Sequence, residues 1–552
     1  MLQDNVEENS SRIGPPAVHI AYSVEEDGRV ESVELPFVIG VLADLCGEPE
    51  EPSSPLAWRK FLRIERENFE DVLAACAPRL VFAVGNRLEP NSASLQVELR
   101  FRSMTDFEPE RVARQVSGLP ESLAAGHPGA SDQLDELLHA PAFQRLEASW
   151  RGLRYLLWTI ETSASLKVCV LNATKRELLS DLREAPAPNR TAVFQKVHDE
   201  PYGTFRGEPF ALLLGDYEFS NGADDLELLE GMASIAAAAD APFIAAASPR
   251  MFGWADFTVL SETRDLPKIF EGAEYTRWRS FRQSGQAAYA ALVMPRILLR
   301  LPYGDATVPV KAFLYQETMT EDGCGNLLWG NPAFALGVRL AEAFRVYHWC
   351  AAIVGPQGGG LVTDLPAITL MDLKGNLAMK GPVEVPLDDI QEAELVDCGF
   401  NCLVHWKGTD MAAFFAATTC LRPRLYHDAA ATTAARLATR LPYVLVVSRF
   451  AHYMKAMLRD RFEAPRSREE CEQLLNDWIS QYVVEDDSSS MEVKACFPLH
   501  NARIEVDEIP DSPGKFRATA FLHPHFQLHD AGVALRVAVD LPTAARSDVA
   551  PL

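Results

Sequence analysis

The stretch ELPFVIGVLAD, residues 34–44, contains an unbroken apolar run from Phe37 to Leu42. A strand with one face in water alternates apolar and polar residues, whereas a strand covered on both faces is apolar throughout. The run therefore predicts a strand buried between two layers. Helical and strand-like periods both recur along the rest of the chain, so we expect a mixed α/β (α+β) fold.

Strand patterns are concentrated at the two ends of the chain. Near the start, Val18, Ile20 and Tyr22 alternate with other residues, and a polar tail at 1–14, expected to be disordered, precedes them. Near the end, strands are predicted at 502–506, 516–522 and 533–541. Between these ends we expect long helices at 134–158, interrupted or restarted near Pro141, and at 336–351.

One stretch breaks both periods. GLPESLAAGHPGAS, residues 118–131, holds two prolines and three glycines, a composition typical of a linker. We therefore divide the chain into a first block at 15–118, a linker at 119–132 and a second block at 133–552.

The composition indicates an acidic globular protein. The 552 residues include 52 Lys and Arg against 77 Asp and Glu, a net charge of -25. Such a surface repels phosphate, which argues against nucleic acid and against an anionic membrane as partners. The ten cysteines form no CxxC pair, as expected for free thiols in a reducing cytosol. No signal peptide and no run of about 18 apolar residues is present, so we expect a cytoplasmic location without membrane insertion.

Motifs for catalysis are sparse. GxxxxGK[ST], HExxH and GxSxG are all absent, and the glycines at 355–360 predict only a tight loop. His523 and His525 are spaced to share one face of a strand and could ligate a metal, but no third ligand is identifiable. His452 lies four residues after Ser448, the spacing of a nucleophile and base on a helix, but without an orienting acid.

Two carboxylates are another candidate for a catalytic site. Asp216 and Glu218 are two apart on an extended segment and could act as an acid/base pair, although salt-bridged loops have this pattern more often. We predict no catalytic, metal or cofactor site. A hydrolase using His452 or the His523/His525 pair stays open as an alternative.

Several arginines have aromatic neighbours. Arg279 follows Trp278, Arg300 comes three residues before Tyr303, and Arg449 precedes Phe450. Arginine that stacks on aromatic rings and pairs with carboxylates is common in cores and interfaces. This pattern favours a protein that makes contacts over one that turns over substrate.

Ordered motifs in the two blocks resemble two families. Residues 17–119 resemble TssB (VipA), the small contractile-sheath subunit of type VI secretion systems, through ELPFVIGVLAD (34–44), PLAWRKF (55–61), ENFEDVL (67–73) and FRSMTDFEPE (101–110). Residues 133–542 resemble TssC (VipB), the large subunit, through FQRLEASWRGL (143–153), GEPF (207–210), GDYEF (215–219), RLPYG (300–304), LWGN (328–331), DLP (364–366), SRFAH (448–452) and LHPHFQ (522–527).

The resemblance implies a structural protein that is not an enzyme. It implies an intertwined sheath-subunit fold whose copies polymerise into a sheath around an inner tube of Hcp. Assembly would start on baseplate proteins, and contraction of the sheath would propel the tube. Strands at both chain ends would add to sheets of neighbouring protomers, so the predicted inter-protomer residues are Val18, Ile20, Tyr22, Ile504, Val506, Phe516 and Ala518. An alternative within the same class is the sheath or tube of another contractile injection system.

The family's recycling partner is a ClpV-type AAA+ unfoldase. In the family it binds a helix in the segment that leads into the large subunit. Here only a short stretch rich in Pro, Gly and Ala lies between Leu119 and Leu134. We therefore expect poor recycling by ClpV.

Overall fold

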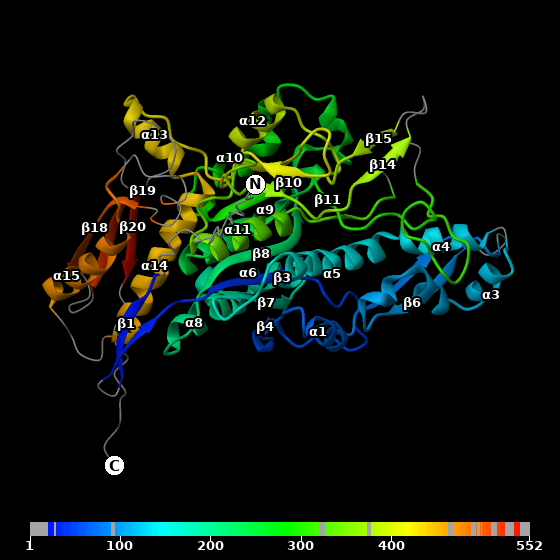
Figure 1. Ribbon diagram of the computed structural model, residues 1–552, viewed down its shortest axis with the longest axis horizontal. Coiled ribbons are helices and arrows are strands. Elements are labelled where there is room, and N and C mark those ends of the chain that lie inside the picture. The colour runs from blue at the N-terminus through cyan, green and yellow to red at the C-terminus, as the bar shows by residue number, and fades with distance from the viewer. Residues whose placement is uncertain are drawn as a thin grey trace, which may run out of the picture.

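The computed structural model describes residues 20–26, 29–89, 94–127, 129–319, 326–371, 377–461, 467–486, 493, 497, 499–508, 516–524 and 535–540. The predicted disordered tail at 1–14 and Val18 lie outside these residues. In Figure 1 the N-terminal strand lies beside the last elements of the chain at one end of the molecule, and helices α3 (Leu119–Ala124) and α4 (Ala130–Leu138) lie at the other.

Among the described residues, the largest sheet has nine strands. Its order is β13 (Leu361–Val362), β17 (Ala412–Phe414), β16 (Phe400–His405), β10 (Ala290–Met294), β9 (Phe243–Ala247), β8 (Phe210–Phe219), β3 (Phe37–Ala43), β7 (Leu166–Asn172), β4 (Leu62–Arg63). β3 pairs in parallel with β7 on one side and with β8 on the other. A strand of the first block is thus inserted between two strands of the second.

β3 is the apolar run predicted from the sequence, and it is buried along its whole length. Its side chains alternate between two cores: Ile39 and Val41 belong to one, Val38 and Leu42 to the other. This follows from the two-residue period of a strand. Burying each such side chain contributes about 1.5–3 kcal/mol. The prediction of a strand covered on both faces is confirmed.

Helices cover both faces of this sheet. The core that holds Ile39 and Val41 includes apolar side chains of α5 (Pro141–Thr159) and α11 (Ala333–Tyr347), while the core that holds Val38 and Leu42 includes those of α9 (Ala223–Ala239). The predicted restart at Pro141 is confirmed, since α4 ends at Leu138 and Pro141 begins α5, where proline costs no hydrogen bond. The predicted helix at 336–351 ends earlier, because His348 takes a left-handed conformation.

The stretch predicted to be an irregular linker is partly helical. α3 covers Leu119–Ala124, and Leu119 and Leu123 are buried in the core. Pro120 does not prevent this helix, because proline is tolerated in the first turn. The expectation of irregular structure throughout 119–132 is therefore wrong, while the block boundaries at 118 and 133 stay a prediction.

The remaining elements surround the sheet. In the first block they are β1 (Tyr22–Glu26), β2 (Arg29–Val33), α1 (Phe69–Cys76), β5 (Arg79–Val84), β6 (Leu95–Arg100) and α2 (Pro109–Arg114). In the second they are α6 (Lys175–Glu184), α7 (Ala192–Phe194), α8 (Glu200–Gly203), α10 (Thr276–Phe281), β11 (Ile297–Leu298), β12 (Trp329–Gly330), β14 (Ile368–Met371), β15 (Leu377–Lys380), α12 (Asp389–Asp397), α13 (Ala429–Leu437), α14 (Leu441–Arg461), α15 (Arg468–Ile479), β18 (Leu499–Glu508), β19 (Phe516–Pro524) and β20 (Leu535–Asp540). The last three strands confirm the predicted strands near the C-terminal end.

The close packing of α5 on α11 gives a test of the core. A Cβ added at Gly152 would lie 2.5 Å from the Phe334 ring. Overpacking costs about 1–3 kcal/mol, which outweighs the gain of about 1 kcal/mol that alanine brings to a helix interior. We expect Gly152→Ala to lower Tm in a thermal unfolding scan. Gly203→Ala, where a Cβ meets open space, is the control, and equal Tm values for the two variants would contradict this packing.

Candidate functional site

The predicted inter-protomer residues come mostly from two segments at opposite ends of the chain. We call α14, α15 and the sheet β18–β19–β20 the C-terminal module. β1 contacts α14, and α15 contacts β18, which places the first described strand on this module, as Figure 1 shows. Both segments are strand-rich, as predicted.

Five of the predicted residues share one hydrophobic cluster, namely Ile20, Tyr22, Ile504, Val506 and Ala518. Ile20 and Tyr22 are 4% and 3% exposed, and the other three are fully buried. Phe516 packs at the margin of the cluster, while Val18 lies outside the described residues. Within a single chain, these side chains therefore dock the N-terminal strand on the chain's own C-terminal module.

Polar side chains of α14 fix the backbone on both sides of β1 and β2. The Tyr453 hydroxyl donates to the Ile20 carbonyl at 2.6 Å and accepts from the Leu35 N–H at 3.0 Å. The Arg449 guanidinium donates to the carbonyls of Leu35 and Pro36, the latter at 3.0 Å. Because all of these groups are buried, each bond also satisfies a backbone group that water cannot reach.

A charged group holds the start of β1. The Tyr22 hydroxyl donates to Oδ2 of Asp460 at 2.5 Å, and Arg459 donates to the same oxygen at 2.8 Å. Burial raises the pKa of Asp460, but the hydrogen bonds from Arg459 and Tyr22 outweigh it and hold the pKa below its ordinary value. Burial, followed by the bond to Asp460, raises the pKa of Tyr22. The pair therefore stays a phenol bound to a carboxylate at neutral pH.

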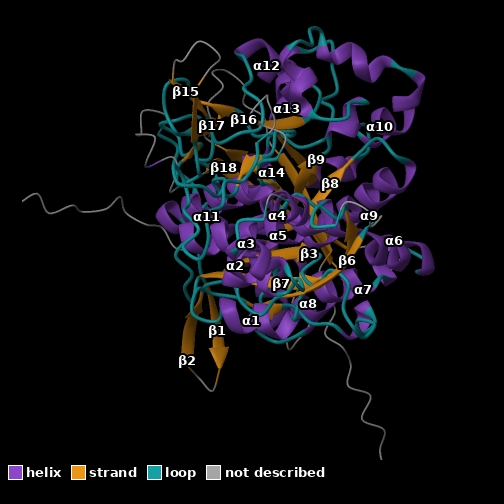
Figure 2. Ribbon diagram, turned by 90° about the vertical axis from the view of Figure 1, so that its right-hand side faces the viewer, coloured by secondary structure: helices purple, strands orange, loops and turns teal. Residues whose placement is uncertain are grey.

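β1 and β2 form a hairpin that leaves strand edges unpaired. Their register runs from Tyr22 opposite Val33 to Glu26 opposite Arg29. Among the described residues, neither strand has a second partner, and Figure 2 shows the hairpin projecting from the body. β20 is likewise an edge strand of its sheet. The outer edge of β18 is instead occupied by α15, because Asn476 bonds to both the N–H and the carbonyl of Ile504, at 2.9 and 2.7 Å. Unpaired edges are templates for strands of another chain.

We expect Tyr453→Phe to loosen the hairpin. The phenyl ring keeps the packing but leaves the Ile20 carbonyl and the Leu35 N–H without this partner, at a cost of about 1–3 kcal/mol. Amide hydrogen exchange across residues 20–36 should become faster, and urea unfolding should show the lost stability. Tyr426→Phe, at a residue 51% exposed, is the control. Unchanged exchange in Tyr453→Phe would contradict the docking.

Of the arginines singled out in the sequence, Arg300 and Arg449 lie against aromatic rings, whereas Arg279 is held by backbone carbonyls. Arg300 is 6% exposed, lies over the Tyr303 ring at 4.5 Å, and contacts Glu147 at 3.0 Å and Glu317 at 2.7 Å. His139 lies 3.0 Å from the other oxygen of Glu317. Arg449 lies 5.0 Å from the Tyr453 ring, and Arg279 donates to the Phe270 and Gly272 carbonyls at 2.6 Å. The prediction of arginines held by rings and carboxylates is confirmed for Arg300.

Glu317 makes this network sensitive to acid. Burial raises its pKa, but His139 and Arg300 outweigh that effect and lower the pKa to about 2. Because the folded-state pKa is below the ordinary 4.5, the stabilisation is present above about pH 4.5 and is lost as the pH falls towards 2.

We expect Glu317→Gln to cost about 3–5 kcal/mol at pH 7, because Arg300 is left with less compensating charge. The difference in unfolding free energy from the parent chain should shrink as the pH is lowered from 5 towards 2, as measured by urea unfolding. Glu110→Gln, which breaks the exposed pair with Arg114, should cost at most about 1 kcal/mol. A difference for Glu317→Gln that is constant with pH would rule out this assignment.

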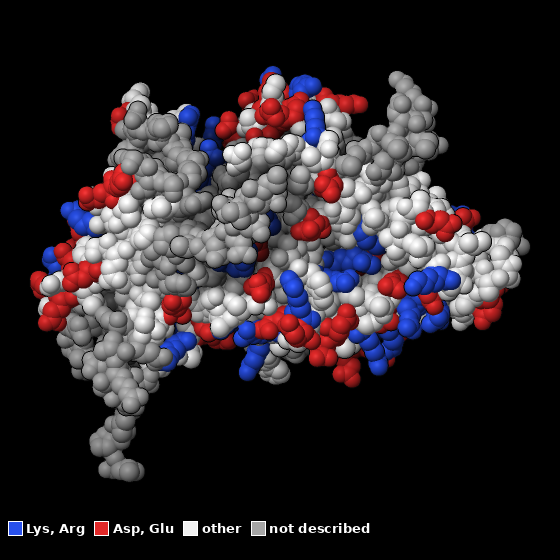
Figure 3. Space-filling view, viewed as in Figure 1, with Lys and Arg blue, Asp and Glu red and all other residues white. Residues whose placement is uncertain are grey.

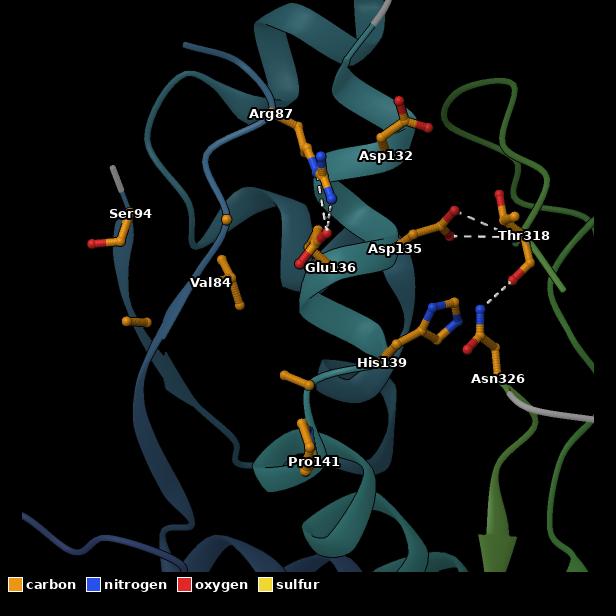
Figure 4. Close-up of a pocket in the computed structure, with 13 residues that line it drawn as sticks. Val84, Arg87, Ser94, Asp132, Asp135, Glu136, His139, Pro141, Thr318 and Asn326 are labelled. Atoms are coloured by element: carbon orange, nitrogen blue, oxygen red, sulfur yellow. Dashed lines mark hydrogen bonds and ion pairs between the residues drawn. The ribbon is translucent and has the colours of Figure 1, made fainter. Parts of the chain in front are cut away.

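A groove of about 780 Å³ lies where the two blocks meet. Figure 4 shows Arg87 pointing to Glu136 of α4, with the shorter contact at 2.5 Å, and Asp135 accepting from the Thr318 N–H at 3.3 Å. The Arg87–Glu136 and Thr318–Asp135 contacts thus link residues from different parts of the chain. The groove therefore lies at the interface between the β5–β6 hairpin, α4 and the loop around Thr318.

Some charges on the surface are also paired. On the face in Figure 3, Lys and Arg lie among Asp and Glu. Arg79 contacts Glu98 at 2.9 Å, and Arg100 contacts Glu50 at 3.0 Å. This face therefore presents mixed charge.

The catalytic candidates lie in settings unsuited to catalysis. His452 is fully buried, donates from Nε2 to the Ala239 carbonyl at 3.2 Å, and has a pKa well below its ordinary value because of burial. Ser448 is also buried. Burial, followed by His500, lowers the pKa of His523 on β19, and His525 lies outside the described residues.

The carboxylate pair is divided between two environments. Burial raises the pKa of Asp216 to about 6, whereas Glu218 pairs with Arg296 at 2.6 Å. Glu218 is thus salt-bridged. In the part of the chain that the structure describes, no group of three or more His, Cys, Asp or Glu could hold a metal ion. Among the same residues, no helix is both long and apolar enough to cross a membrane.

Comparison with known proteins accounts for this architecture. The family described as EvpB/VC_A0108, tail sheath N-terminal domain, matches residues 129–421, and its gpW/gp25-like domain matches 430–541. The family described as type VI secretion system, VipA, VC_A0107 or Hcp2, matches 10–140. These matches define a structural protein of the contractile-sheath class. The chain belongs to the type VI secretion system sheath family and joins VipA-like and VipB-like parts in one polypeptide.

Two relatives from Pseudomonas aeruginosa match the two parts. The type VI secretion system sheath protein TssC1 is 41% identical over 432 residues, which is 78% of this chain and 87% of that protein. The sheath protein TssB1 is 40% identical over 146 residues, which is 24% of this chain and 84% of that protein. The family is structural rather than enzymatic, so the His452 and His523/His525 alternatives are set aside.

Two solved structures show weak likeness. The baseplate of the anti-feeding prophage gives a TM-score of 0.37 at 11% identity, covering 96% of this chain and 98% of that chain. The contracted helical sheath of the same particle gives 0.34 at 11% identity, covering 92% and 88%. Scores this low do not establish a common fold.

Proposed function

We propose that this single chain is the complete repeating unit of a type VI contractile sheath in the cytoplasm, and that it needs no separate small subunit. The observation that supports this most directly is the pairing of β3 with both β7 and β8. Because the first block supplies a central strand of the second block's sheet, both subunit types are already combined in one folded unit. An Hcp-like inner tube would fill the polymer, and baseplate proteins would start it.

Adjacent units would be joined by strand addition. The edges of the β1–β2 hairpin and of β20, which have no further strand partner among the described residues, support this part of the proposal. Ile20 and Tyr22 anchor the hairpin on the C-terminal module of its own chain. Ile504, Val506, Phe516 and Ala518 are the residues of that module that pack in the same cluster. A neighbour's hairpin would use the same backbone hydrogen bonds that any sheet edge offers.

Recycling by a ClpV-type unfoldase would be poor. Between the two blocks the chain does form helices, but the apolar side chains of α3 and α4 are buried in the core, including Leu119, Leu123 and Leu134. A helix recognised in a groove must offer its apolar face. The helices here present theirs to their own protein.

The hairpin can be removed without removing its anchors. Tyr22 and Val33 lie opposite each other, so a short Gly/Ser turn can replace residues 23–32. We expect the purified parent chain to form long tubes in negative-stain microscopy. The shortened variant should keep the parent's thermal unfolding curve and yet form no tubes.

Each outcome separates one part of the proposal. A parent chain that polymerises only after a second sheath protein is added would overturn the single-chain unit. A shortened variant that forms normal tubes would overturn the role of the hairpin and leave the single-chain unit standing.

A further inference from the structure

The helix α14 presents two different stripes of side chains. Phe450 and Met454 belong to the hydrophobic cluster of the C-terminal module. His452, Lys455 and Arg459 are spaced three and four residues apart, which places them together on another stripe of the helix. Figure 1 shows α14 between the sheet β18–β19–β20 and the main sheet. The helix thus holds its own module through apolar side chains and turns a polar stripe towards the rest of the molecule.

The polar stripe binds the backbone of the body, by which we mean the nine-stranded sheet and the helices around it. His452 donates from Nε2 to the Ala239 carbonyl at 3.2 Å, and the Lys455 ammonium donates to the Ala238 carbonyl at 3.1 Å. Both carbonyls lie in the last turn of α9, where a helix leaves carbonyls unpaired and carries partial negative charge. α14 therefore caps α9 across the boundary between the module and the body.

Arg459 extends the same contact. Its guanidinium donates to the Pro201 carbonyl at 2.9 Å and to the Gly207 carbonyl at 3.1 Å. The ring of Tyr202 lies 6.4 Å from the His452 ring and 4.9 Å from the Lys455 ammonium. These contacts join polar side chains of the module to the body, and polar contacts between parts of a chain permit relative movement more readily than a large apolar interface does.

His452 is the titratable group at the centre of this stripe, and it is fully buried. With Nε2 donating to Ala239, the neutral ring carries its lone pair on Nδ1. Nδ1 is buried and has no hydrogen-bond partner among the described residues. A proton bound there would create a buried charge without an acceptor, which is costly.

The cations on α14 oppose protonation of the ring. Burial, followed by the charges of Arg449 and Lys455, holds the pKa of His452 well below its ordinary value of 6.5. The carbonyls of Ala239 and Asp240 act in the other direction and are outweighed. The ring therefore stays neutral while α14 is docked.

The body contributes its own titratable groups to this cluster, namely Asp240, His198, Tyr202 and Tyr289. Asp240 is engaged by Lys455 at 2.6 Å, and burial raises the pKa of Asp240, so its protonation would favour the docked state in acid and oppose the effect of His452. His198 pairs with Asp199 at 2.8 Å. Burial raises the pKa of both tyrosines, which keeps them protonated near neutral pH.

We propose that His452 is an acid-sensitive switch in the contact between the C-terminal module and the body. At neutral pH the uncharged ring caps α9 and keeps α14 docked. A proton from solvent that binds Nδ1 places a third cation beside Arg449 and Lys455, and the second half of α14 then separates from α9. Leu441 and Leu445, at the start of α14, stay in the core of the main sheet, so the helix turns about that end.

Docking should weaken as the pH falls. In the open state the ring is solvated and takes up a proton near pH 6.5, whereas in the docked state it does so only at lower pH. The docking equilibrium constant is therefore steady well above pH 6.5 and drops about tenfold for each pH unit below it, down to the docked-state pKa. This inference rests on contacts within one chain and not on the proposed assembly.

The test uses the full chain and amide hydrogen exchange at about pH 7.5 and about pH 5.5, with each rate divided by the intrinsic rate at that pH. We expect peptides from residues 449–461 to lose about tenfold in protection at the lower pH, while peptides covering β3 keep theirs. His452→Gln supplies a neutral amide that can still donate to the Ala239 carbonyl, and it should show the same protection at both pH values. His198→Gln, at a partly exposed histidine, is the control and should respond as the parent chain does.

Two results would overturn the proposal directly: equal protection of residues 449–461 in the parent chain at both pH values, or a full acid response in His452→Gln. Loss of protection in β3 together with α14 would also overturn it, because that is unfolding of the whole chain. If His452→Gln is already open at the higher pH, Lys455→Gln decides the question. It removes a cation that opposes protonation, so its protection should fall less with acid, and a fall as steep as the parent's would overturn the proposal.

Discussion

The fold depends on one strand pairing. β3 lies between β7 and β8 and pairs in parallel with both, so neither of those strands can complete its hydrogen bonds without it. The same strand supplies side chains to the cores on both faces of the sheet. Removing it would leave two rows of unpaired backbone groups and two open cores at once, and each would cost free energy that the remaining contacts could not replace. The first block is therefore a structural part of the second.

The contact at the other end of the molecule is of a different kind. The β1–β2 hairpin is held by Ile20, Tyr22 and a few hydrogen bonds from α14 and α15. Single hydrogen bonds contribute only about 0.5–1.5 kcal/mol each. β3 is paired on both sides and fixed, whereas the hairpin has free edges and a small number of anchors. In the assembly proposed above, the free edges of the hairpin would be available to neighbouring units, while β3 holds each unit together.

Sequence periodicity predicted the parts of the fold whose signals are local. The apolar run at Phe37–Leu42, the restart at Pro141 and the strands near the C-terminal end were all visible in this way. The helix α3 was missed because Pro120 and the nearby glycines were read as breakers, although a proline in the first turn leaves the helix intact. The spacing of Leu119 and Leu123, four residues apart, was the signal that could have found it.

The docking site could be predicted only in part. Aromatic neighbours correctly marked Arg300 and Arg449 as packed residues. Their polar partners are distant in the sequence: Glu147 pairs with Arg300, and Arg449 donates to the Pro36 carbonyl. Tyr22 and Asp460 are 438 residues apart, and no local pattern links a phenol to a carboxylate over such a distance. The contact between the two blocks was predicted from the motifs that resemble two sheath subunits. The spacing of residues within each block could not have predicted it.

The position of β3 in the chain also has a consequence for biosynthesis. Phe37 pairs with Leu166, so the ribosome completes this apolar strand long before its first partner. At about 5–20 residues per second, the interval is roughly 6–26 s. During that time the nascent chain carries an unpaired, aggregation-prone segment. In one polypeptide the partner strands always follow on the same ribosome, so the strand never has to find a separately translated protein.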